Sequence, residues 1–345
     1  MKHLIQIQKK LEKKLPELLE QWRKKYRLAE ISPLLDFSLQ DFVLRPGKRL
    51  RPVLMVMGYA GYGGKAVPGL YQAALSFELL HDFMLVHDDI VDKSKMRRGC
   101  PALHILIRKF LPKGKNRVTG QDLALIAGDV LYAAAIETFL SIKVPVRRKE
   151  KALKRFVAAA LLTGAGQFSE MELGTRKINQ VNEKQILRIY DLKTALYSFV
   201  TPLAVGAILA GASEKEVSYL SRAGFYFGRA FQIHDDILGL FGKQSHTGKP
   251  VVTDLQEEKK TLLIWYAFQK GDRKQQNLIL QVLGKEKVTV DDLYQIQKVV
   301  KETGSLKSAE RRIRILSDRA ELWLKRSGIK PAFREELVSY IGSIL

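Results

Sequence analysis

Two pairs of adjacent aspartates lie inside apolar stretches of this 345-residue chain, and these are the residues best suited to chemistry. The first pair is Asp88-Asp89, followed by Asp92, and the second pair is Asp235-Asp236. Adjacent carboxylates repel one another and are costly to bury without a compensating cation. Lysine and arginine are absent within one helical turn of the second pair, and the lysines just after the first cluster point off a different helix face. The pattern predicts divalent ions such as Mg²⁺, which bridge carboxylates to substrate phosphates.

Helix geometry makes the first cluster more specific. Asp88 and Asp92 are four residues apart, so on a helix their side chains share one face, with Asp89 beside them. Glycine and proline are absent from Leu70 to Arg98, so we expect this stretch to form one unbroken helix. A solvated acidic helix face is the alternative. A second acidic pair in equally apolar surroundings, with basic motifs elsewhere, favours a metal site that holds a diphosphate.

Two basic motifs are suited to phosphate. One is Gly47–Pro52, with the sequence GKRLRP, and the other is Arg97-Arg98-Gly99, which follows the first acidic cluster within two helical turns. Arginine can donate two parallel hydrogen bonds to phosphate oxygens, and lysine supplies a compact charge. A solvated basic surface is the alternative for either motif alone. Together the motifs predict two diphosphates, one held through metal and one held directly by Lys48, Arg51 and Arg98.

These motifs and several others resemble, in the same order, those of the trans-isoprenyl diphosphate synthases, the family that includes farnesyl and geranylgeranyl diphosphate synthases. The match begins at about Phe42 and runs to the C-terminus. The matching segments are Gly47–Pro52, Glu78–His81, Val86–Asp92, Arg97–Gly99, Gly128-Asp129, Gly166-Gln167, Lys193–Ala195, Phe231–Asp236, Thr247–Lys249 and Asp254–Thr261.

The resemblance implies a prenyltransferase: isopentenyl diphosphate condenses with dimethylallyl, geranyl or farnesyl diphosphate after metal-assisted ionisation, and pyrophosphate is released. It also implies three Mg²⁺ ions per active site, with Mn²⁺ as an alternative metal. The metal ligands that it implies are Asp88, Asp89, Asp92, Asp235, Asp236 and Glu170. Contacts to the allylic diphosphate would come from Arg97, Lys193, Thr194, Gln232, Lys249 and Lys259. Contacts to isopentenyl diphosphate would come from Lys48, Arg51, His81 and Arg98. The residues that carry catalysis would be Asp88, Asp92, Asp235, Lys193 and Lys249.

Four positions depart from the family pattern. Gly239 stands where a third aspartate usually ends the second cluster, and Glu170 stands where an aspartate usually follows Gly166-Gln167. Val252 and Glu258 occupy positions where glycine is common. Because Gly239 offers no carboxylate, we expect the third metal ion to be held less firmly, and Gly239→Asp to lower the Mg²⁺ requirement.

Product length is predicted from the residue five positions before the first aspartate, which tends to form the floor of the elongation cavity in this family. That residue is Phe83, and Met84 follows it. A phenylalanine blocks the tunnel of the long-chain enzymes, whereas a flexible methionine can yield space. We therefore expect geranylgeranyl diphosphate (C20), with farnesyl diphosphate (C15) as the runner-up. A simple core role for Phe83 is the alternative.

Helical periodicity dominates the chain, notably in Ala152–Leu162, Ile186–Val200 and Leu220–Phe241, and no Ser/Pro/Gly-rich linker divides it. We predict an all-α fold: a single domain over residues 1–345, with many helices bundled around a deep central cavity. The resemblance also implies a homodimer.

Charge and targeting signals add weaker predictions. A net charge of +22 is compatible with peripheral association with anionic membrane, whereas no nucleic-acid-binding motif accompanies it. Met1–Glu20 has no signal-peptide pattern, and the single Cys100 suits a reducing compartment, so we expect a cytoplasmic protein.

Three other functions are compatible with parts of the pattern. A terpene cyclase on the same fold would need no isopentenyl site, and a non-catalytic synthase subunit is suggested by Gly239 and Glu170. A basic nucleic-acid-binding helical protein is the third, disfavoured by acidic pairs that repel phosphate. We favour an active short-chain synthase.

Overall fold

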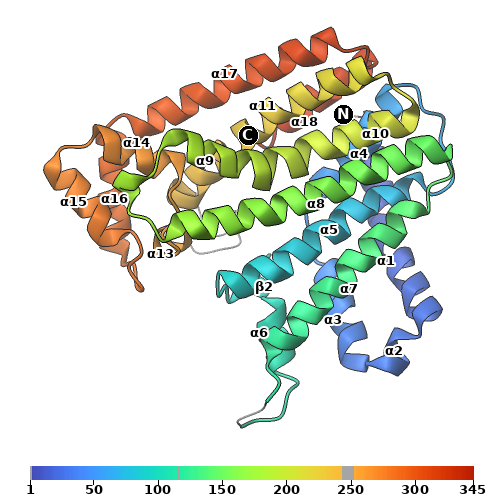
Figure 1. Cartoon of the computed structure of the whole chain (residues 1–345), viewed down its shortest axis with the longest axis horizontal. Coiled ribbons are helices and arrows are strands. Elements are labelled where there is room, and N and C mark those ends of the chain that lie inside the picture. Colours follow the sequence, from blue (N-terminus) through green and yellow to red (C-terminus); the bar gives the residue numbers. More distant parts are fainter. Residues whose placement is uncertain (1, 115–116, 243–251) are drawn as a thin grey trace. The chain divides into compact units, whose positions relative to one another are not determined.

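The computed structural model describes residues 2–114, 117–242 and 252–345, so Lys249 and the rest of the Thr247–Lys249 motif lie outside the described residues. Within the described residues the regular elements are helical, apart from one short hairpin of β1 (Met96–Arg97) and β2 (Cys100–Pro101) (Figure 1). The predicted all-α fold is confirmed.

The chain divides into two compact units. Unit 1 comprises Met1–Leu153 and Val205–Gly211, and unit 2 comprises Lys154–Ala204 and Ala212–Leu345. Helices α8 (Val146–Gly174) and α10 (Thr201–Ala210) contribute residues to both units, so no linker separates the units. A single domain over the whole chain stays a prediction.

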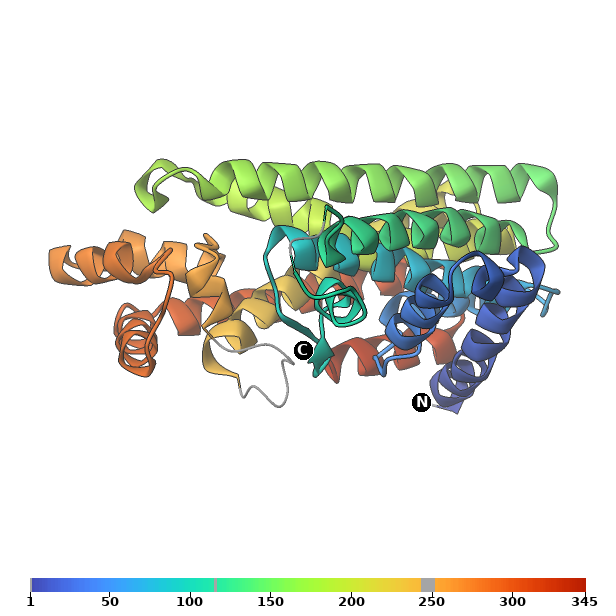
Figure 2. The ribbon, with the colours of Figure 1, turned by 90° about the horizontal axis from the view of Figure 1, so that it is seen from below.

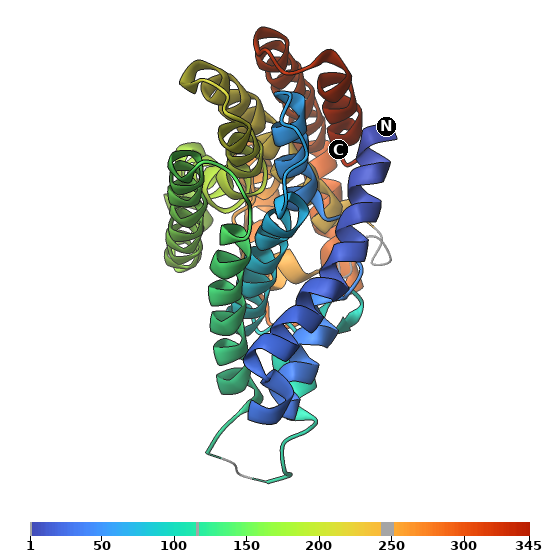
Figure 3. The ribbon, with the colours of Figure 1, turned by 90° about the vertical axis from the view of Figure 1, so that its right-hand side faces the viewer.

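The centre of unit 1 is a pair of long helices, α5 and α7, that lie side by side (Figure 1). The apolar residues of α5, among them Ala73, Ala74 and Phe77, are fully buried. Helix α1 packs against α4 and α5 through its row of buried leucines (Figure 3). The remaining helices of this unit complete its core. The helices of unit 1 are α1 (Lys2–Tyr26), α2 (Leu28–Ile31), α3 (Pro33–Val43), α4 (Leu50–Gly61), α5 (Leu70–Val91), α6 (Leu103–Arg108) and α7 (Gly120–Leu140).

The prediction of one unbroken helix over Leu70–Arg98 is correct as far as Val91 and wrong beyond it. Asp92 caps α5, and Lys93 then adopts a left-handed φ of 53°, which ends the helix. The chain continues into the hairpin, whose two-residue loop Arg98-Gly99 has φ values of 53° and 74°. Two consecutive positive φ values are typical of the type I′ turn, which favours glycine. Both arginines of the second basic motif therefore lie on a hairpin.

Unit 2 is built around α11, which packs against α17 and against the π-helical segment η2 (Figure 1). The short helices α14, α15 and α16 pack together at one end of this unit (Figure 2). The apolar stretches predicted to be helical in this part of the chain are helical. The elements of unit 2 that follow α8 are η1 (Ile178–Gln180), α9 (Glu183–Tyr190), η2 (Asp191–Val200), α11 (Glu214–Phe241), α13 (Thr253–Gln256), α14 (Leu262–Lys270), α15 (Arg273–Val282), α16 (Val290–Glu302), α17 (Ser305–Arg326) and α18 (Pro331–Gly342).

Two helical stretches of the described residues are long and apolar enough to cross a membrane by length and composition. One is Glu183–Ala210, which is 83% buried, as a core helix of a folded protein would be. The other is Gly120–Leu140, the span of α7, which is only 39% buried. The α7 helix therefore has an apolar face that unit 1 leaves largely uncovered.

The contact of α11 with η2 depends on a glycine. A Cβ at Gly228 would overlap the Ala195 Cα and would lie 2.7 Å from its Cβ. This close approach brings the Gln232 end of α11 to the segment that carries Lys193 and Thr194.

Gly228→Ala should therefore destabilise the protein by about 1–3 kcal/mol, because overpacking forces the two helices apart. Gly164→Ala is the matched control, since nothing lies within 4 Å of a Cβ at that helical position. The control should be neutral or stabilising by up to about 1 kcal/mol, as alanine favours a helix over glycine. Denaturant unfolding curves measure both effects, and equal stability of the two variants would refute the close contact.

Candidate functional site

Helix α5 carries two rows of ionisable side chains on neighbouring faces. One row, Glu78, Asp82 and Asp89, has spacings of four and seven residues and is 0–1% exposed. The second row is His81, Asp88 and Asp92, with spacings of seven and four residues, and it is partly exposed. The two rows have different surroundings and therefore different chemistry.

Arginines contact Glu78 and Asp82, the first two residues of the buried row. Glu78 Oε1 accepts hydrogen bonds from Arg49 Nη1 at 2.7 Å and from Arg98 Nη2 at 3.2 Å. Asp82 Oδ1 lies 3.4 Å from Arg98 Nη1. Burial, and next the charge of Glu78, raise the pKa of Asp82 well above its usual value, while the arginines oppose this shift. The result is that Arg98 is held in place by two buried acids.

Asp89 is neutralised by Arg97. Arg97 Nε donates to both oxygens of Asp89, at 2.9 and 3.1 Å, and Arg97 Nη2 also bonds to Asp89. Arg97 Nη2 lies 3.6 Å from Asp88 Oδ2, so this arginine also reaches the exposed row. Burial alone would lower the pKa of Arg97, but the bond to Asp89 and the charges of Asp89, Asp88 and Asp92 together offset this and raise the pKa. The buried position of Asp89 and its pairing make it a residue that positions Arg97.

The exposed carboxylates fit the expected magnesium ions. Asp88 and Asp92 offer only oxygen ligands, one helical turn apart, and both are partly exposed. Mg²⁺ keeps several waters and commonly takes one or two carboxylates plus substrate phosphates, so no complete protein cage is required. The described residues contain no group of three or more acidic, histidine or cysteine side chains arranged to hold a metal. The substrate would complete such a site.

The basic residues of unit 1 gather at the start of α4. A Cβ at Gly47 would lie 3.5 Å from Arg98 Cζ, which places the hairpin arginine against the loop that carries Lys48. Arg51 stands in the first turn of α4, whose N-terminus also favours anions. Burial, followed by the charges of Arg51 and Arg98, lowers the pKa of His81 well below its usual value. The structure therefore brings together all four residues predicted to bind isopentenyl diphosphate, with a neutral histidine among cations.

The predicted chain-length residue packs within unit 1 against α7. The Phe83 ring lies 4.7 Å from the His87 ring and 5.1 Å from the Tyr132 ring, between centroids. A Cβ at Gly128 would overlap the His87 imidazole, so this glycine lets α7 approach closely. Phe83 and the following Met84 are partly exposed. Tyr132 thus adds a second aromatic ring beside Phe83, which sequence reasoning missed.

The second aspartate pair, in unit 2, also divides into one exposed and one buried member. Asp235 is exposed and Asp236 is 6% exposed. Asp236 accepts hydrogen bonds from Tyr190 and from Gln232 Nε2, the latter at 3.0 Å. Thr194 in turn donates its hydroxyl to Gln232. The network joins three predicted site residues on η2 and α11 and leaves Asp235 as the outward carboxylate.

Hydrogen bonds rather than arginines stabilise the buried member of this pair. Burial raises the pKa of Asp236 well above its usual value, and the charges of Asp254 and Asp235 raise it further, whereas the bonds from Tyr190 and Gln232 lower it. Burial also raises the pKa of Tyr190, whose hydroxyl accepts the Leu262 N–H at 2.8 Å.

Lys193 stands on the π-helical segment and pairs with Glu170 of α8. A Cβ at Gly166 would lie 2.8 Å from Leu192 Cβ and 3.1 Å from Lys193 Cγ, so the Gly166-Gln167 motif allows the two helices to meet. π-helical insertions are frequent at functional sites because they re-aim side chains. Glu170, a predicted metal ligand, is thus the partner of a predicted diphosphate ligand.

Lys259 lies in the segment after α13, where Nζ is 2.6 Å from Glu257 Oε2 and 3.4 Å from Asp254 Oδ1. The two residues before Lys259 are Glu257 and Glu258, and both add acidic charge to this segment. Glu258 has a φ of 54°, a left-handed conformation that glycine adopts without strain, which explains why glycine is common at this position in the family.

Sequence reasoning missed several residues that position the predicted ones. They are Arg49, Glu78, Asp82, Tyr190 and Asp254. The spacing of Glu78, Asp82 and Asp89 on an apolar helix was an available signal, because three acids on one buried face require buried cations. Asp254 begins the matching segment Asp254–Thr261, which was an available signal. For Tyr190 the sequence contains no comparable signal, since its partner Asp236 is far away in the chain.

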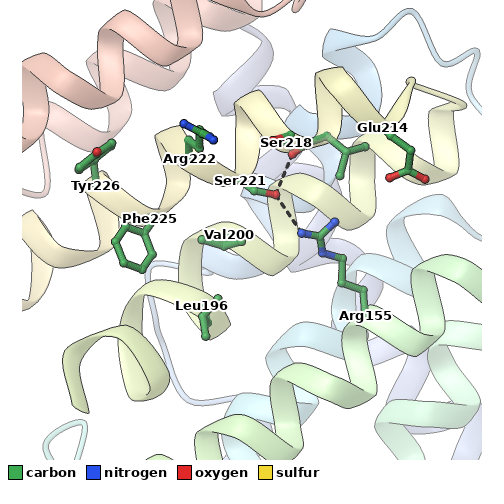
Figure 4. Close-up of a pocket in the computed structure, with 10 residues that line it drawn as sticks. Arg155, Leu196, Val200, Glu214, Ser218, Ser221, Arg222, Phe225 and Tyr226 are labelled. Carbon is green, nitrogen blue, oxygen red and sulfur yellow. Dashed lines mark hydrogen bonds between the residues drawn. The ribbon is translucent and has the colours of Figure 1, made fainter. Parts of the chain in front are cut away.

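Unit 2 also has an open pocket of about 470 Å³ that is separate from these residues (Figure 4). Its walls come from α8, η2 and α11, and Arg155 Nη2 donates to Ser221 Oγ at 3.0 Å inside it. None of the predicted site residues lines this pocket. It is therefore not the predicted central cavity, which stays a prediction.

The comparisons with known proteins agree with the geometry. Residues 32–300 match the model of the polyprenyl synthetase family, and the chain belongs to this family. It is a trans-prenyltransferase, an enzyme class whose substrates are isoprenyl diphosphates and which in general depends on magnesium.

Three similar proteins illustrate the relationship. The geranylgeranyl diphosphate synthase of Sulfolobus acidocaldarius is 32% identical over 281 residues, covering 81% of this chain and 80% of that protein. The geranylfarnesyl diphosphate synthase of Aeropyrum pernix is 34% identical over 303 residues, covering 86% and 88%. The structure of geranylgeranyl pyrophosphate synthase from Corynebacterium glutamicum, complexed with isoprenyl diphosphate and magnesium, superposes with a TM-score of 0.89 at 26% identity and covers 97% of each chain.

Proposed function

We propose that this enzyme condenses isopentenyl diphosphate with dimethylallyl, geranyl and farnesyl diphosphates, with geranylgeranyl diphosphate as its main product. One observation supports this most strongly. A single face of α5 presents His81 at an arginine-rich site and, seven residues or about 10 Å further along, the carboxylate Asp88. Two anion sites of opposite chemistry, one cationic and one requiring metal, suit two diphosphate substrates.

The cationic site would hold isopentenyl diphosphate without metal. Lys48, Arg51 and Arg98 supply charge, and neutral His81 supplies a hydrogen bond. Arg98 is pre-oriented by Glu78, so little conformational entropy is lost when it binds a diphosphate. A terpene cyclase would have no use for this site, which is why we prefer the condensing enzyme.

The acidic site would hold the allylic diphosphate. When bound there, Mg²⁺ would neutralise the charge that develops on the departing diphosphate. Asp88 and Asp92 would be its ligands on α5, and Asp235 is assigned the corresponding role in unit 2. Arg97 would contact the same diphosphate while Asp89 holds it.

The unit 2 side chains would support that role. Lys193, Thr194, Gln232 and Lys259 are assigned to the allylic diphosphate, as is Lys249, which lies outside the described residues. We assign Asp236 and Glu170 to positioning, since Gln232 and Lys193 respectively bond to them. Three Mg²⁺ ions per site, and Mn²⁺ as a substitute, remain predictions.

The reaction breaks the allylic C1–O bond and one C–H bond of the isopentenyl unit, and it forms a C–C bond and a new C=C double bond. The allylic C1–O bond breaks, the isopentenyl double bond attacks C1, and the adduct loses a proton to the released pyrophosphate. The side chains named above bind, orient and neutralise, and none of them is required as a nucleophile.

Asp88→Ala should lower the rate of condensation by on the order of 10²-fold or more, because a group that stabilises the departing charge is lost. Chelation should abolish wild-type activity, and added Mg²⁺ should restore it. The assay measures products from dimethylallyl and isopentenyl diphosphates by mass spectrometry. Asp318→Ala, at an exposed carboxylate on α17, is the control and should retain wild-type activity. Near-normal turnover of Asp88→Ala would show that the metal site is misassigned.

The same assay separates the alternative functions. Cyclic products without isopentenyl diphosphate would indicate a terpene cyclase, and an inactive wild-type protein would indicate a non-catalytic subunit.

Product length rests on Phe83 and its aromatic neighbour. The names of the relatives include both C20 and C25 products, so this chain's own residues carry the argument. The rings of Phe83 and Tyr132 lie against each other and would together block the growing prenyl chain, whereas Met84 can yield space. This combination supports geranylgeranyl diphosphate, with farnesyl diphosphate as the runner-up.

Phe83→Ala should give products longer than the wild-type limit, because it removes the ring that would stop the growing chain. Tyr132→Phe keeps both rings and is the matched control, for which the wild-type product should persist. Mass spectrometry of the dephosphorylated products compares the chain lengths. An unchanged distribution for Phe83→Ala would return Phe83 to an ordinary core role.

A homodimer would cover the apolar surfaces that each unit leaves exposed. On α7 Leu125 and Ile126 are 46% and 54% exposed, and on α8 Leu161, Phe168 and Met171 are 68%, 73% and 51% exposed. Such surfaces on a soluble enzyme are typical of protein interfaces. A second copy of this chain is the occupant that we propose.

Phe168→Glu should weaken or abolish this dimer, because it places a charge in an apolar interface. Sedimentation velocity measures the shift from dimer to monomer. Leu322→Glu, at a 56% exposed leucine on α17, is the control and should leave the dimer intact. A wild-type monomer, or an undisturbed Phe168→Glu dimer, would contradict the proposed interface.

Three further properties stay predictions. We propose a cytoplasmic location and no nucleic-acid partner. The charge of +22 supports weak binding to anionic membrane, which co-sedimentation with anionic vesicles at low salt tests.

A further inference from the structure

Position 239 on α11 corresponds to the missing third carboxylate of the second cluster. It lies four residues after Asp235, so its side chain would share a helix face with that carboxylate, as Asp92 does with Asp88. Glycine leaves this place without a side chain. Another carboxylate fills it: a Cβ at Gly239 would overlap Asp254 Oδ2 and would lie 3.5 Å from Asp254 Cγ. Apart from the local backbone of the helix, no other described atom lies within 4 Å of that point.

The backbone at Asp254 is anchored. It belongs to α13, whose Leu255 is 2% exposed in the core of unit 2. The Gly284 N–H donates to Leu255 O at 2.8 Å, and the Lys259 N–H donates to Asp254 O at 2.9 Å. The position of the carboxylate over Gly239 therefore follows from how α13 packs.

The charges around Asp254 agree with a role at the cluster. Lys259 lies closer to Glu257, at 2.6 Å, than to Asp254, at 3.4 Å. The Asp254 side chain is 32% exposed, so it can reach an ion or a bound water.

We propose that Asp254 supplies from α13 the carboxylate that Gly239 lacks on α11, and that with Asp235 it contacts the magnesium ion of the second cluster or a water bound to that ion. This proposal rests on the proposed function. It changes the expectation for Gly239→Asp: the new Cβ would displace Asp254, so the single substitution exchanges one carboxylate for another. A gain in metal affinity is therefore no longer expected.

The experiment measures binding of inorganic pyrophosphate to the full-length protein by calorimetry, at a series of Mg²⁺ concentrations. Asp254→Asn should raise the Mg²⁺ concentration for half-maximal binding by about ten- to a hundred-fold, as loss of a ligand-orienting group typically does. Glu257→Gln is the matched control in the same segment, because it also removes a partner of Lys259 but lies away from Gly239. It should leave the Mg²⁺ dependence unchanged. The double variant Gly239→Asp/Asp254→Ala should return the dependence towards that of the wild type.

The outcomes separate this proposal from the proposed function. If wild-type protein binds pyrophosphate with Mg²⁺ and Asp254→Asn shifts no more than Glu257→Gln, Asp254 only holds Lys259 and the proposal is overturned. Failure of the double variant to recover, with an unaltered thermal melt, also overturns it. If wild-type protein shows no Mg²⁺-dependent pyrophosphate binding, the proposed function itself fails.

Discussion

Burial of negative charge inside apolar helices is the constraint on which the rest of the structure depends. Helix α5 carries Glu78, Asp82 and Asp89 on a face that is almost completely buried, and unpaired charges there would be prohibitively costly. Arginines pair with Glu78 and Asp89, and this pairing fixes where Arg97 and Arg98 stand. The raised pKa of Asp82 favours its uncharged form. The hairpin after α5 folds back and places these arginines against the acidic residues of the helix. The buried acids thus hold the cations that substrate binding needs.

Unit 2 solves the same problem without arginine. Asp236 is buried beside Tyr190 and Gln232, and its raised pKa reflects an environment that disfavours charge. In both units one aspartate of the adjacent pair is used inside the protein, and the other faces outward. This division explains how two adjacent carboxylates can be tolerated: one of each pair is bonded inside the protein, and the other would be left to the proposed metal ion and its diphosphate.

The two rows on α5 also explain how one helix can serve two substrates. Burial and the neighbouring arginines lower the pKa of His81 and favour its neutral form. Asp88 and Asp92 lie about two and about three turns further along the helix. In the proposed function, one end would attract an anion directly and the other only with metal. Gly128, Gly166 and Gly228 support these groups, because each lets another helix or side chain approach where a Cβ would overlap or crowd it.

The sequence by itself determined the helical class and the family, because these follow from local periodicity and from motifs a few residues long. The same motifs predicted the residue types of both proposed diphosphate sites. The sequence also determined that Asp88 and Asp92 share a face, since helix geometry requires it. Only the tertiary structure decided which aspartate of each pair is buried, where α5 ends, and that Asp254 lies over Gly239. These features depend on contacts between segments far apart in the chain, such as Tyr190 with Asp236, and local sequence carries no information about such distant partners. The expectation for Gly239 looked for the missing carboxylate on the same helix, whereas packing brings Asp254 to that position from another helix.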